Sequence, residues 1–313
     1  MPNPDTEDQL RIISLTSFLS KVCEQFVLDW LLHYVEDKLD WKQYGGVKGS
    51  SITHYLIDFV NFVLYNQDLN VPHAVIAVMF DFSKAFNRIN HHIIIRILSD
   101  MGVPAWLLHI VIGFLTDREL VVRYKGYKSD RRSLPGGTPQ GTKLGLFLFL
   151  ILINYAGIEN LENNIGSIIT KPLSKRNPIK NNHMKYVDDL SFMEALNLEK
   201  YLVPNLNPTL PLSFYDRTYH ILPNDNTKLQ THINSLVKFA ADHEMQINEQ
   251  KCKVMMFNSR KKFDATPNLL IDDTELEVVE VYKLLGIQIR SDLSWVDNTD
   301  YICRKAYKRL WIL

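Results

Sequence analysis

The stretch Tyr186-Val187-Asp188-Asp189-Leu190-Ser191-Phe192 carries most of the information in this sequence. It places two adjacent carboxylates between aromatic and apolar residues, which predicts the turn of a β-hairpin. Like charges on neighbouring residues repel, and each raises the pKa of the other unless a cation lies between them. The pair therefore indicates a divalent metal ion. The simpler alternative is a solvated turn, because Asp forms local hydrogen bonds in turns, and Asp272-Asp273 is expected to be such a turn.

A third carboxylate, Asp81, favours the metal ion. It follows Val75-Ile76-Ala77-Val78-Met79-Phe80, a short, continuous apolar run typical of a strand buried on both faces. An acid at the end of a buried strand is costly unless it is neutralised. If this strand lies beside the hairpin, three carboxylates converge. Hard cations such as Mg²⁺ take oxygen ligands, and two such ions can activate a hydroxyl and stabilise leaving pyrophosphate. The pattern therefore indicates nucleotidyl transfer.

Three segments, in this order along the chain, resemble the central palm motifs of reverse transcriptases from non-LTR, LINE-type retrotransposons. They are Phe80-Asp81-Phe82-Ser83-Lys84-Ala85-Phe86, Gly137-Thr138-Pro139-Gln140-Gly141-Thr142-Lys143-Leu144-Gly145 and Tyr186-Val187-Asp188-Asp189. Further segments resemble a fingers motif (residues 11–16), the segment before the first palm strand (43–51), the motif after the aspartate pair (247–253) and the primer-grip hairpin (282–287). The resemblance thus extends over almost the whole chain.

The resemblance implies an α+β fold of the right-hand polymerase kind. An antiparallel palm sheet would pack on helices, with partial helical fingers and a thumb stub. The expected division is a partial fingers region at residues 1–74, a palm with the catalytic motifs and primer grip at 75–290, and the start of a truncated thumb at 291–313. A fingers insertion is expected at roughly 90–140. With no endonuclease segment recognised, we expect a piece of a larger retrotransposon polyprotein whose endonuclease and thumb are absent.

The resemblance also assigns a metal-binding role to residues of the palm. Asp81 and Asp188 would hold two Mg²⁺ ions, with Asp189 beside them and the backbone carbonyl of Phe82 as a further ligand. Mn²⁺ is the alternative ion. The primer grip would be formed by Tyr282, Leu285 and Gly286.

Four more residues are assigned to the nucleotide. Phe86 matches the steric gate that excludes a ribose 2′-OH, and Gln140 would contact the incoming nucleotide or the template. Arg11 would bind the triphosphate, and Lys251 would protonate the leaving pyrophosphate. Without the resemblance, Phe86 would be a core aromatic at a strand-to-helix junction. Lys251 would be a solvated lysine at a strand edge, and Arg11 a surface arginine.

Together these features predict an RNA-directed DNA polymerase, a nucleotidyltransferase that extends a DNA primer on an RNA template with dNTPs. Asn87 and Asn90 stand where related elements usually carry aspartates, and Leu146 replaces a common proline. None of the three is a metal ligand in the family. They leave open the alternative of a catalytically inactive remnant or domesticated fragment with weak RNA binding.

The composition is that of a folded protein and excludes few classes. With 313 residues, 46% of them hydrophobic, the chain can bury a large core. Its 35 basic and 35 acidic residues give no net charge, unlike a dedicated nucleic-acid binder. Basic residues nevertheless cluster in three places, which are Arg123, Lys125, Lys128, Arg131 and Arg132; Arg260, Lys261 and Lys262; and Arg304, Lys305, Lys308 and Arg309.

Cysteine spacing and hydropathy predict the location. Cys23, Cys252 and Cys303 show no paired or metal-ligand spacing, which favours a reducing, intracellular compartment, the nucleus or the cytoplasm. The longest apolar stretch, residues 144–153, is too short to span a bilayer. We therefore expect no membrane association and a buried helix at 144–153.

Hydrophobic periodicity predicts the remaining elements. A first helix is expected from an apolar stripe made by Leu19, Val22, Cys23, Phe26, Val27, Trp30, Leu31 and Tyr34. Other helices are expected at 52–64, 94–101, 106–115, 229–240 and from 301 onward, a strand at 119–125, and polar loops at 157–183 and 197–226.

Overall fold

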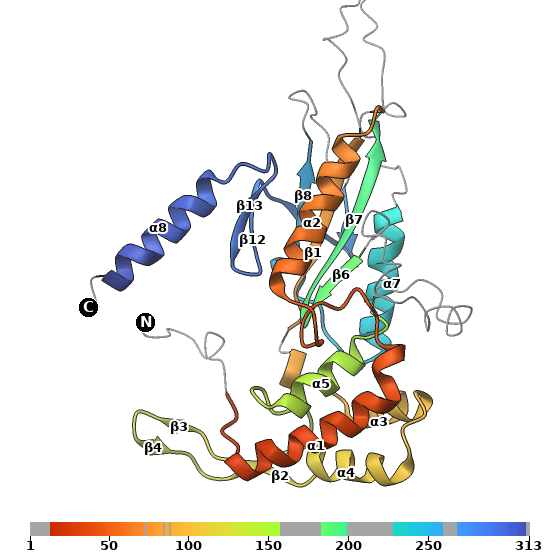
Figure 1. Ribbon diagram of the computed structural model, residues 1–313, viewed down its shortest axis with the longest axis vertical. Coiled ribbons are helices and arrows are strands. Elements are labelled where there is room, and N and C mark those ends of the chain that lie inside the picture. Colours follow the sequence, from red (N-terminus) through yellow and green to blue (C-terminus); the bar gives the residue numbers. More distant parts are fainter. Residues whose placement is uncertain are drawn as a thin grey trace, which may run out of the picture.

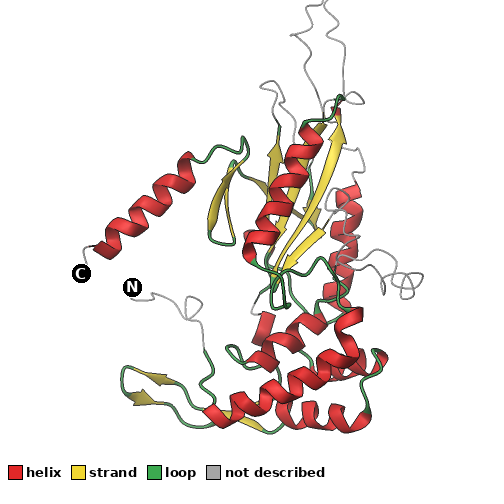
Figure 2. Ribbon diagram, viewed as in Figure 1, coloured by secondary structure: helices red, strands yellow, loops and turns green. Residues whose placement is uncertain are grey.

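The computed structural model describes residues 13–71, 73–83, 85–87, 89–156, 183–198, 228–258 and 268–310. In these parts a sheet with helices on both faces stands above a mostly helical lobe (Figure 1). Figure 2 shows the same separation, with most helices gathered at one end and the long strands at the other.

The main sheet has five strands in the order β11-β8-β1-β7-β6. Their bounds are β1 (His73–Phe80), β6 (His183–Tyr186), β7 (Asp189–Asn197), β8 (Lys253–Phe257) and β11 (Glu277–Val278). The central strand β1 pairs antiparallel with β7 and β8, β6 pairs antiparallel with β7, and the short β11 is parallel to β8. Seven of the eight residues of β1 are buried, so the strand predicted to be buried on both faces is confirmed.

Alternate residues of β1 enter two separate cores, because side chains alternate across a strand. Ile76 and Phe80 join the larger core with α3 (His91–Asp100), α5 (Lys143–Leu152) and α7 (Lys228–Asp242). Ala77 and Met79 join the smaller core on the opposite face, which α2 (Ile52–Gln67) covers. Figure 1 shows α2 and α7 on either side of the sheet.

The lobe below the sheet contains α1 (Phe18–Val35), α3, α4 (Ala105–Leu115) and α5. Helix α5 is buried through eight of its ten residues, as expected for a helix inside the core. The helix predicted here is confirmed, and of its predicted stripe Val27 and Leu31 are buried, whereas Leu19, Val22, Phe26 and Trp30 are exposed. The buried residues are Glu24, Val27, Leu31 and Val35. Helix α1 is apolar around more than one face, so periodicity alone does not select the face that meets α5.

One long, interrupted β-hairpin extends from this lobe. Strand β2 (Arg118–Leu120) pairs with β5 (Arg132–Leu134), and β3 (Arg123–Tyr124) pairs with β4 (Tyr127–Lys128). The strand predicted at 119–125, with a turn at Gly126, is present but divided into β2 and β3, which have different partners. The basic cluster of Arg123, Lys125, Lys128, Arg131 and Arg132 is exposed on this hairpin.

Short elements complete the described chain. They are η2 (Glu36–Lys38), η3 (Ala85–Asn87), η7 (Glu249–Lys251), β9 (Leu270–Ile271), β10 (Thr274–Glu275), β12 (Val281–Leu284), β13 (Ile287–Arg290) and α8 (Val296–Leu310). The predicted loops at 157–183 and 197–226 and the basic cluster at 260–262 lie largely or wholly outside the described residues. Strands β6 and β7 nonetheless take in His183 and Asn197.

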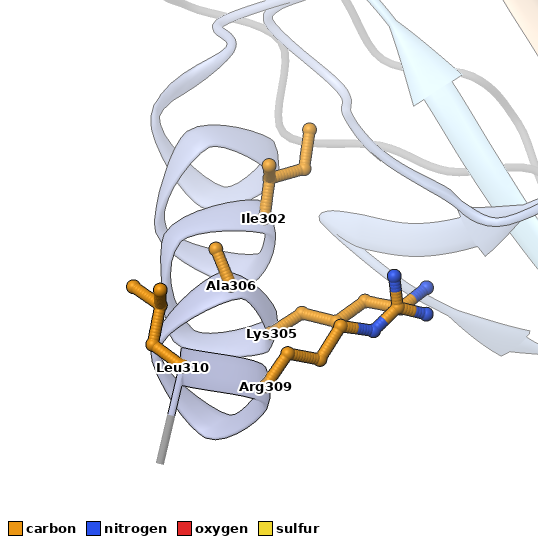
Figure 3. Close-up of a pocket in the computed structure, with 5 residues that line it drawn as sticks. All are labelled: Ile302, Lys305, Ala306, Arg309 and Leu310. Carbon is orange, nitrogen blue, oxygen red and sulfur yellow. The ribbon is translucent and has the colours of Figure 1, made fainter. Parts of the chain in front are cut away.

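The C-terminal helix α8 begins at Val296, earlier than predicted, and has no buried residue. Figure 3 shows a hollow on this helix lined by Ile302, Lys305, Ala306, Arg309 and Leu310. All five belong to α8, so the hollow is the open side of one helix. Lys305 and Arg309 extend to the same side of it.

The fold class is therefore confirmed: it is α+β, with a largely antiparallel sheet packed on helices. Among the described helices, none is both long enough and apolar enough to cross a membrane. All three cysteines are unpaired.

Candidate active site

Carboxylates lie at the same edge of two neighbouring strands, since Asp81 follows β1 and Asp189 begins β7. Phe80 pairs with Leu190, so Asp81 and Asp189, the next residues on β1 and β7, are neighbours where the ladder ends. Tyr186 pairs with Asp189 across the β6–β7 hairpin, which leaves Val187 and Asp188 as a two-residue turn. The sequence-predicted aspartates thus lie together at one end of the sheet, with Asp188 exposed.

The turn itself is strained. Val187 has a φ of 60°, in the left-handed region that β-branched residues rarely adopt. Two-residue hairpin turns need a positive φ, which Gly or Asn usually supplies. A residue with a Cβ in this region costs roughly 1–2 kcal/mol. Such a conformation persists where surrounding contacts hold it, and these sites are often functional.

Lys251 is brought to Asp81 by the backbone. Phe82 forms an antiparallel bridge with Ile247, and Asn248 donates its N–H to the Asp81 carbonyl at 2.8 Å. This pairing places η7 beside the end of β1, with Lys251 Nζ 3.5 Å from Asp81 Oδ2. Both side chains are open to solvent, so the ion pair is weak. The bridge is made by the residues flanking Phe82 and does not use the Phe82 carbonyl.

The three aspartates lie near one another along the backbone, but their side chains are not arranged around an ion. Within the described residues, no group of three or more His, Cys, Asp or Glu side chains is arranged to hold an ion. The expected convergence of Asp81, Asp188 and Asp189 is thus met by their backbone positions, while their side chains do not form a cluster. Their oxygen donors are nevertheless of the kind that Mg²⁺ prefers.

The first two palm-like motifs are joined at η3. The Phe86 carbonyl accepts the N–H of Thr138 at 2.8 Å, and a Cβ at Gly137 would lie 2.8 Å from the same oxygen. The half-buried ring of Phe86 stacks on Phe149 of α5, with centroids 4.5 Å apart. Gln140 is half-buried in the loop that follows, and its carbonyl accepts the N–H of Ser14 at 2.8 Å.

The segment predicted as a primer grip is a tight hairpin. Leu284 pairs with Ile287, so Leu285 and Gly286 form its turn, with φ angles of 48° and 92°. Two positive φ angles define a type I′ turn. Burial, together with the negative charges of Asp189 and Asp81, raises the pKa of Tyr282 to about 12. Tyr282 therefore lies within electrostatic range of the aspartates. Arg11, predicted to bind the triphosphate, lies outside the described residues.

A buried charged cluster behind the hairpin was missed by the sequence analysis. Lys185 of β6 is fully buried, and its Nζ lies 2.9 Å from Asp40 Oδ2. The same ammonium donates to the carbonyls of Ile153 and Asn154 at 3.2 and 2.6 Å. His183 Nε2 lies 3.0 Å from Asp40 Oδ2. The cluster therefore ties β6, one residue before Tyr186, to residue 40 and to the end of α5.

The pKa shifts in this cluster define its charges. Burial alone would raise the pKa of Asp40, but Lys185 and His183 outweigh it and hold that pKa well below its usual range. Burial lowers the pKa of His183 to about 4, so this imidazole is neutral at pH 7. It donates from Nε2 to Asp40 and accepts at Nδ1 from Lys42, whose Nζ is 3.2 Å away. The ion pair is thus Asp40 with Lys185.

No signal in the sequence revealed this cluster. Asp40 and Lys185 are far apart along the chain, and a lysine in the short segment His183-Met184-Lys185-Tyr186 is typical of a solvated strand or loop. Lysine is rarely buried unless paired. Its burial here depends on a partner that only the folded chain supplies.

Aspartates on adjoining strand ends, next to a tight hairpin, agree with the family comparison. The chain belongs to the reverse transcriptase (RNA-dependent DNA polymerase) family, whose model matches residues 1–289. Among curated proteins, it is similar to the RNA-directed DNA polymerase from mobile element jockey of Drosophila melanogaster, with 23% identity over 316 residues. It is also similar to the probable RNA-directed DNA polymerase from transposon BS of the same organism, with 22% identity over 316 residues.

These matches cover 99% of this chain but only 30% and 31% of the two relatives. The sequence-based assignment to the reverse transcriptases of non-LTR retrotransposons is confirmed. Among solved structures, the chain is similar to apo telomerase from Candida tropicalis truncated from its C-terminal domain, with a TM-score of 0.48 and 11% identity over 88% of this chain and 44% of that chain. For the telomerase of that organism with a TWJ fragment of telomeric RNA, the TM-score is 0.49 and the identity 13%, over 90% and 38%.

Proposed function

We propose that this chain is the polymerase domain of a retrotransposon reverse transcriptase and catalyses RNA-directed DNA synthesis. One observation carries the proposal: Asp81 and Asp189 lie at the same edge of two paired strands, and Asp188 lies in the turn beside them, in a chain of the reverse transcriptase family. The substrates would be an RNA template, a DNA primer and dNTPs. The chain spans under a third of the length of these two relatives. The polymerase activity of the whole protein is therefore part of the proposal.

In this proposal Asp81 and Asp188 hold two Mg²⁺ ions, or Mn²⁺, with Asp189 beside them and the Phe82 carbonyl as a further ligand. Bound metal would supply an activated primer hydroxyl and a stabilised leaving pyrophosphate. The chain's own contribution is to present the ligands from two paired strands. Lys251, 3.5 Å from Asp81, occupies a suitable position to protonate the pyrophosphate.

We further propose that Phe86 excludes ribonucleotides, that Gln140 contacts the nucleotide or the template, and that Arg11 binds the triphosphate. The stacking of Phe86 on Phe149 would keep its ring rigid, which steric exclusion requires. The hairpin β12–β13 would hold the primer through Tyr282, Leu285 and Gly286.

The domain division remains part of the proposal, with partial fingers at 1–74, a palm at 75–290 that carries a fingers insertion at roughly 90–140, and the start of a thumb at 291–313. The proposed setting is a reducing intracellular compartment, the nucleus or the cytoplasm, in keeping with three unpaired cysteines.

A primer-extension assay tests the activity. The folded chain is given a DNA primer on an RNA template, the four dNTPs and Mg²⁺, with Mn²⁺ and EDTA in parallel reactions. We expect extension with either ion and none with EDTA. A folded chain that extends no primer with either ion contradicts the proposal and favours the inactive remnant.

A second assay tests the sugar gate. Phe86→Val should lower the ratio of kcat/KM for deoxynucleotides over ribonucleotides, because the ring no longer excludes the 2′-OH. Phe147→Leu is the control, since Phe147 is another buried aromatic of α5, the helix that carries Phe149. It should lower stability and leave the ratio unchanged. An unchanged ratio in a folded, active Phe86→Val chain would make Phe86 an ordinary core aromatic.

A further inference from the structure

Residues 40–45, here called the brace, contact the edge of β6 through one isolated parallel bridge. The N–H of Tyr44 donates to the Lys185 carbonyl at 2.8 Å, and the N–H of Lys185 donates to the Lys42 carbonyl at 3.0 Å. Gln43 forms the parallel bridge with Lys185 between them. At one end the brace is fixed by the buried pair of Asp40 and Lys185, with 2.9 Å between Oδ2 and Nζ. Its other end reaches the Val187–Asp188 turn.

The side chain of Gln43 holds this turn directly. Its Oε1 accepts the N–H of Val187 and the N–H of Gly45, each at 3.1 Å. The side chain is buried, and its Nε2 has no hydrogen-bond partner among the described residues. Leaving a buried amide donor unpaired costs about 1–3 kcal/mol. An apolar side chain of similar shape would avoid that cost. What Gln43 contributes at this position is therefore its acceptor oxygen, Oε1, which binds the two backbone N–H groups.

Gly45 meets the same turn by direct contact. A Cβ at this position would lie 2.8 Å from the backbone nitrogen of Val187 and 2.7 Å from its Cγ2. It would also lie 3.1 Å from the carbonyl carbon of Tyr186. The φ of Gly45 is not positive, so its backbone conformation does not require glycine. The requirement is the close approach of two backbones, which any side chain would push apart.

We propose that Gln43 and Gly45 are positioning residues of the polymerase site. Together they hold Val187 in its left-handed conformation and thereby fix the place of Asp188 relative to Asp81. The catalytic consequence rests on the proposed function. The geometric part does not, because it concerns only the conformation of the turn.

The first test replaces Gln43 by methionine, which keeps the shape of the side chain and removes the acceptor. Gln230→Met is the matched control, because Gln230 Oε1 also accepts a backbone N–H, that of Leu270 at 3.0 Å, away from the turn. Hydrogen exchange of the Val187 amide should speed up about tenfold or more in Gln43→Met, as expected for the loss of one hydrogen bond. It should be unchanged in Gln230→Met.

The second test inserts a methyl group under the turn. Gly45→Ala should move the turn, and Gly113→Ala is its control, since a Cβ at Gly113 of α4 meets nothing within 4 Å. In both Gln43→Met and Gly45→Ala, kcat should fall by about 10- to 100-fold, because a displacement of about 1 Å at a catalytic group costs this much. The KM for dNTP should stay within about threefold, since the substrate contacts remain.

A third readout does not depend on turnover. Binding of Mn²⁺, followed by electron paramagnetic resonance of the free ion, should weaken severalfold in Gln43→Met and Gly45→Ala and stay constant in both controls. A residue that only stabilises the core would lower the melting temperature and leave Mn²⁺ binding and the kcat-to-KM pattern of the folded chain unchanged.

The outcomes separate the two proposals. Parental kcat, Mn²⁺ binding and Val187 exchange in folded Gln43→Met and Gly45→Ala chains would overturn the positioning role while the polymerase proposal stands. If the parent extends no primer but the Val187 amide loses protection in Gln43→Met, the polymerase proposal fails and the geometric role of the brace is supported.

Discussion

Two hairpins of this chain carry neighbouring aspartates at a two-residue turn, and they differ in what lies behind them. Val187 and Asp188 connect β6 to β7, and Asp272 and Asp273 connect β9 to β10. In each turn the first residue has a positive φ, 60° at Val187 and 50° at Asp272. The local backbone is therefore similar in the two hairpins.

The residue types and surroundings are different. Asp adopts the left-handed region far more readily than Val, for which that region is strained. Asp272 and Asp273 are both exposed, while Val187 is half-buried and its N–H is taken by the buried Gln43. An aspartate pair alone therefore does not define a site. Two features distinguish the first turn from the second. Its strained Val187 is held by a tertiary hydrogen bond, and it lies beside Asp81, which follows the neighbouring strand.

The largest expected contrast is catalytic. Asp188→Asn should reduce primer extension by at least about 1,000-fold, because it removes the charge of a proposed metal ligand at almost constant volume. Asp272→Asn should leave extension unchanged. The measurement is kcat/KM for dNTP incorporation, with circular dichroism to verify folding. Near-parental extension by a folded Asp188→Asn chain would remove Asp188 from the proposed site.

The next contrast is in stability. Lys185→Met should lower the free energy of unfolding by about 3–5 kcal/mol, because it leaves Asp40 charged and unpaired in the core. Lys253→Met, which removes the partner of the exposed Glu277, should cost at most about 1 kcal/mol. Urea denaturation measures both. If Lys185→Met lowers the free energy of unfolding by less than about 1 kcal/mol, the Asp40–Lys185 pair is not buried away from water as in the structure.

The pH dependence of stability should reveal the same cluster. His183 has a pKa of about 4 in the folded chain against 6.5 for the ordinary imidazole. Between these values the unfolded chain binds more protons, so stability is lost as the pH falls from about 6.5 to 4, by a few kcal/mol at most. Asp40, with its depressed pKa, adds a loss at still lower pH.

Thermal unfolding of the parent and of His183→Asn across this pH range measures the effect. The variant should show a flatter profile between pH 6.5 and 4. His109→Asn is the control, because His109 is an exposed residue of α4 and should leave the profile unchanged. Identical slopes in the parent and His183→Asn would mean that His183 titrates normally in the folded chain.

The smallest effect is expected at the second turn. Asp272→Gly should change the free energy of unfolding by no more than about 0.5 kcal/mol. Position 272 is exposed, and both aspartate and glycine accept its positive φ. A destabilisation above 1 kcal/mol would show that Asp272 has a structural role absent from this comparison.

Features coded within a short window of sequence were predictable. The apolar run before Asp81 indicated a doubly buried strand, and β1 is one. Helical spacing located α2 and α7, and the Leu144-to-Ile153 stretch located the buried α5. In each case the period of the hydrophobic residues matched the element.

Features that depend on long-range contacts were not predictable. Helix α1 is apolar on several faces, so which face meets α5 was decided by packing. Lys185 and Asp40 pair across most of the chain, and Gln43 reaches Val187 through a side chain in a segment without regular periodicity. The meeting of the three aspartates at one end of the sheet could thus be predicted from the sequence. The contacts that hold the Val187–Asp188 turn could not.

The brace has a consequence for how the molecule behaves in crowded solution. Strand β6 is an edge strand of the five-stranded sheet. Unpaired N–H and C=O groups on an edge strand can pair with strands of other molecules. The brace already occupies the outward-facing N–H and carbonyl of Lys185. At the opposite border the sheet finishes with β11, which is two residues long. Neither border of the described sheet therefore offers a long template for intermolecular β-pairing, and at the β6 border this is due to the brace.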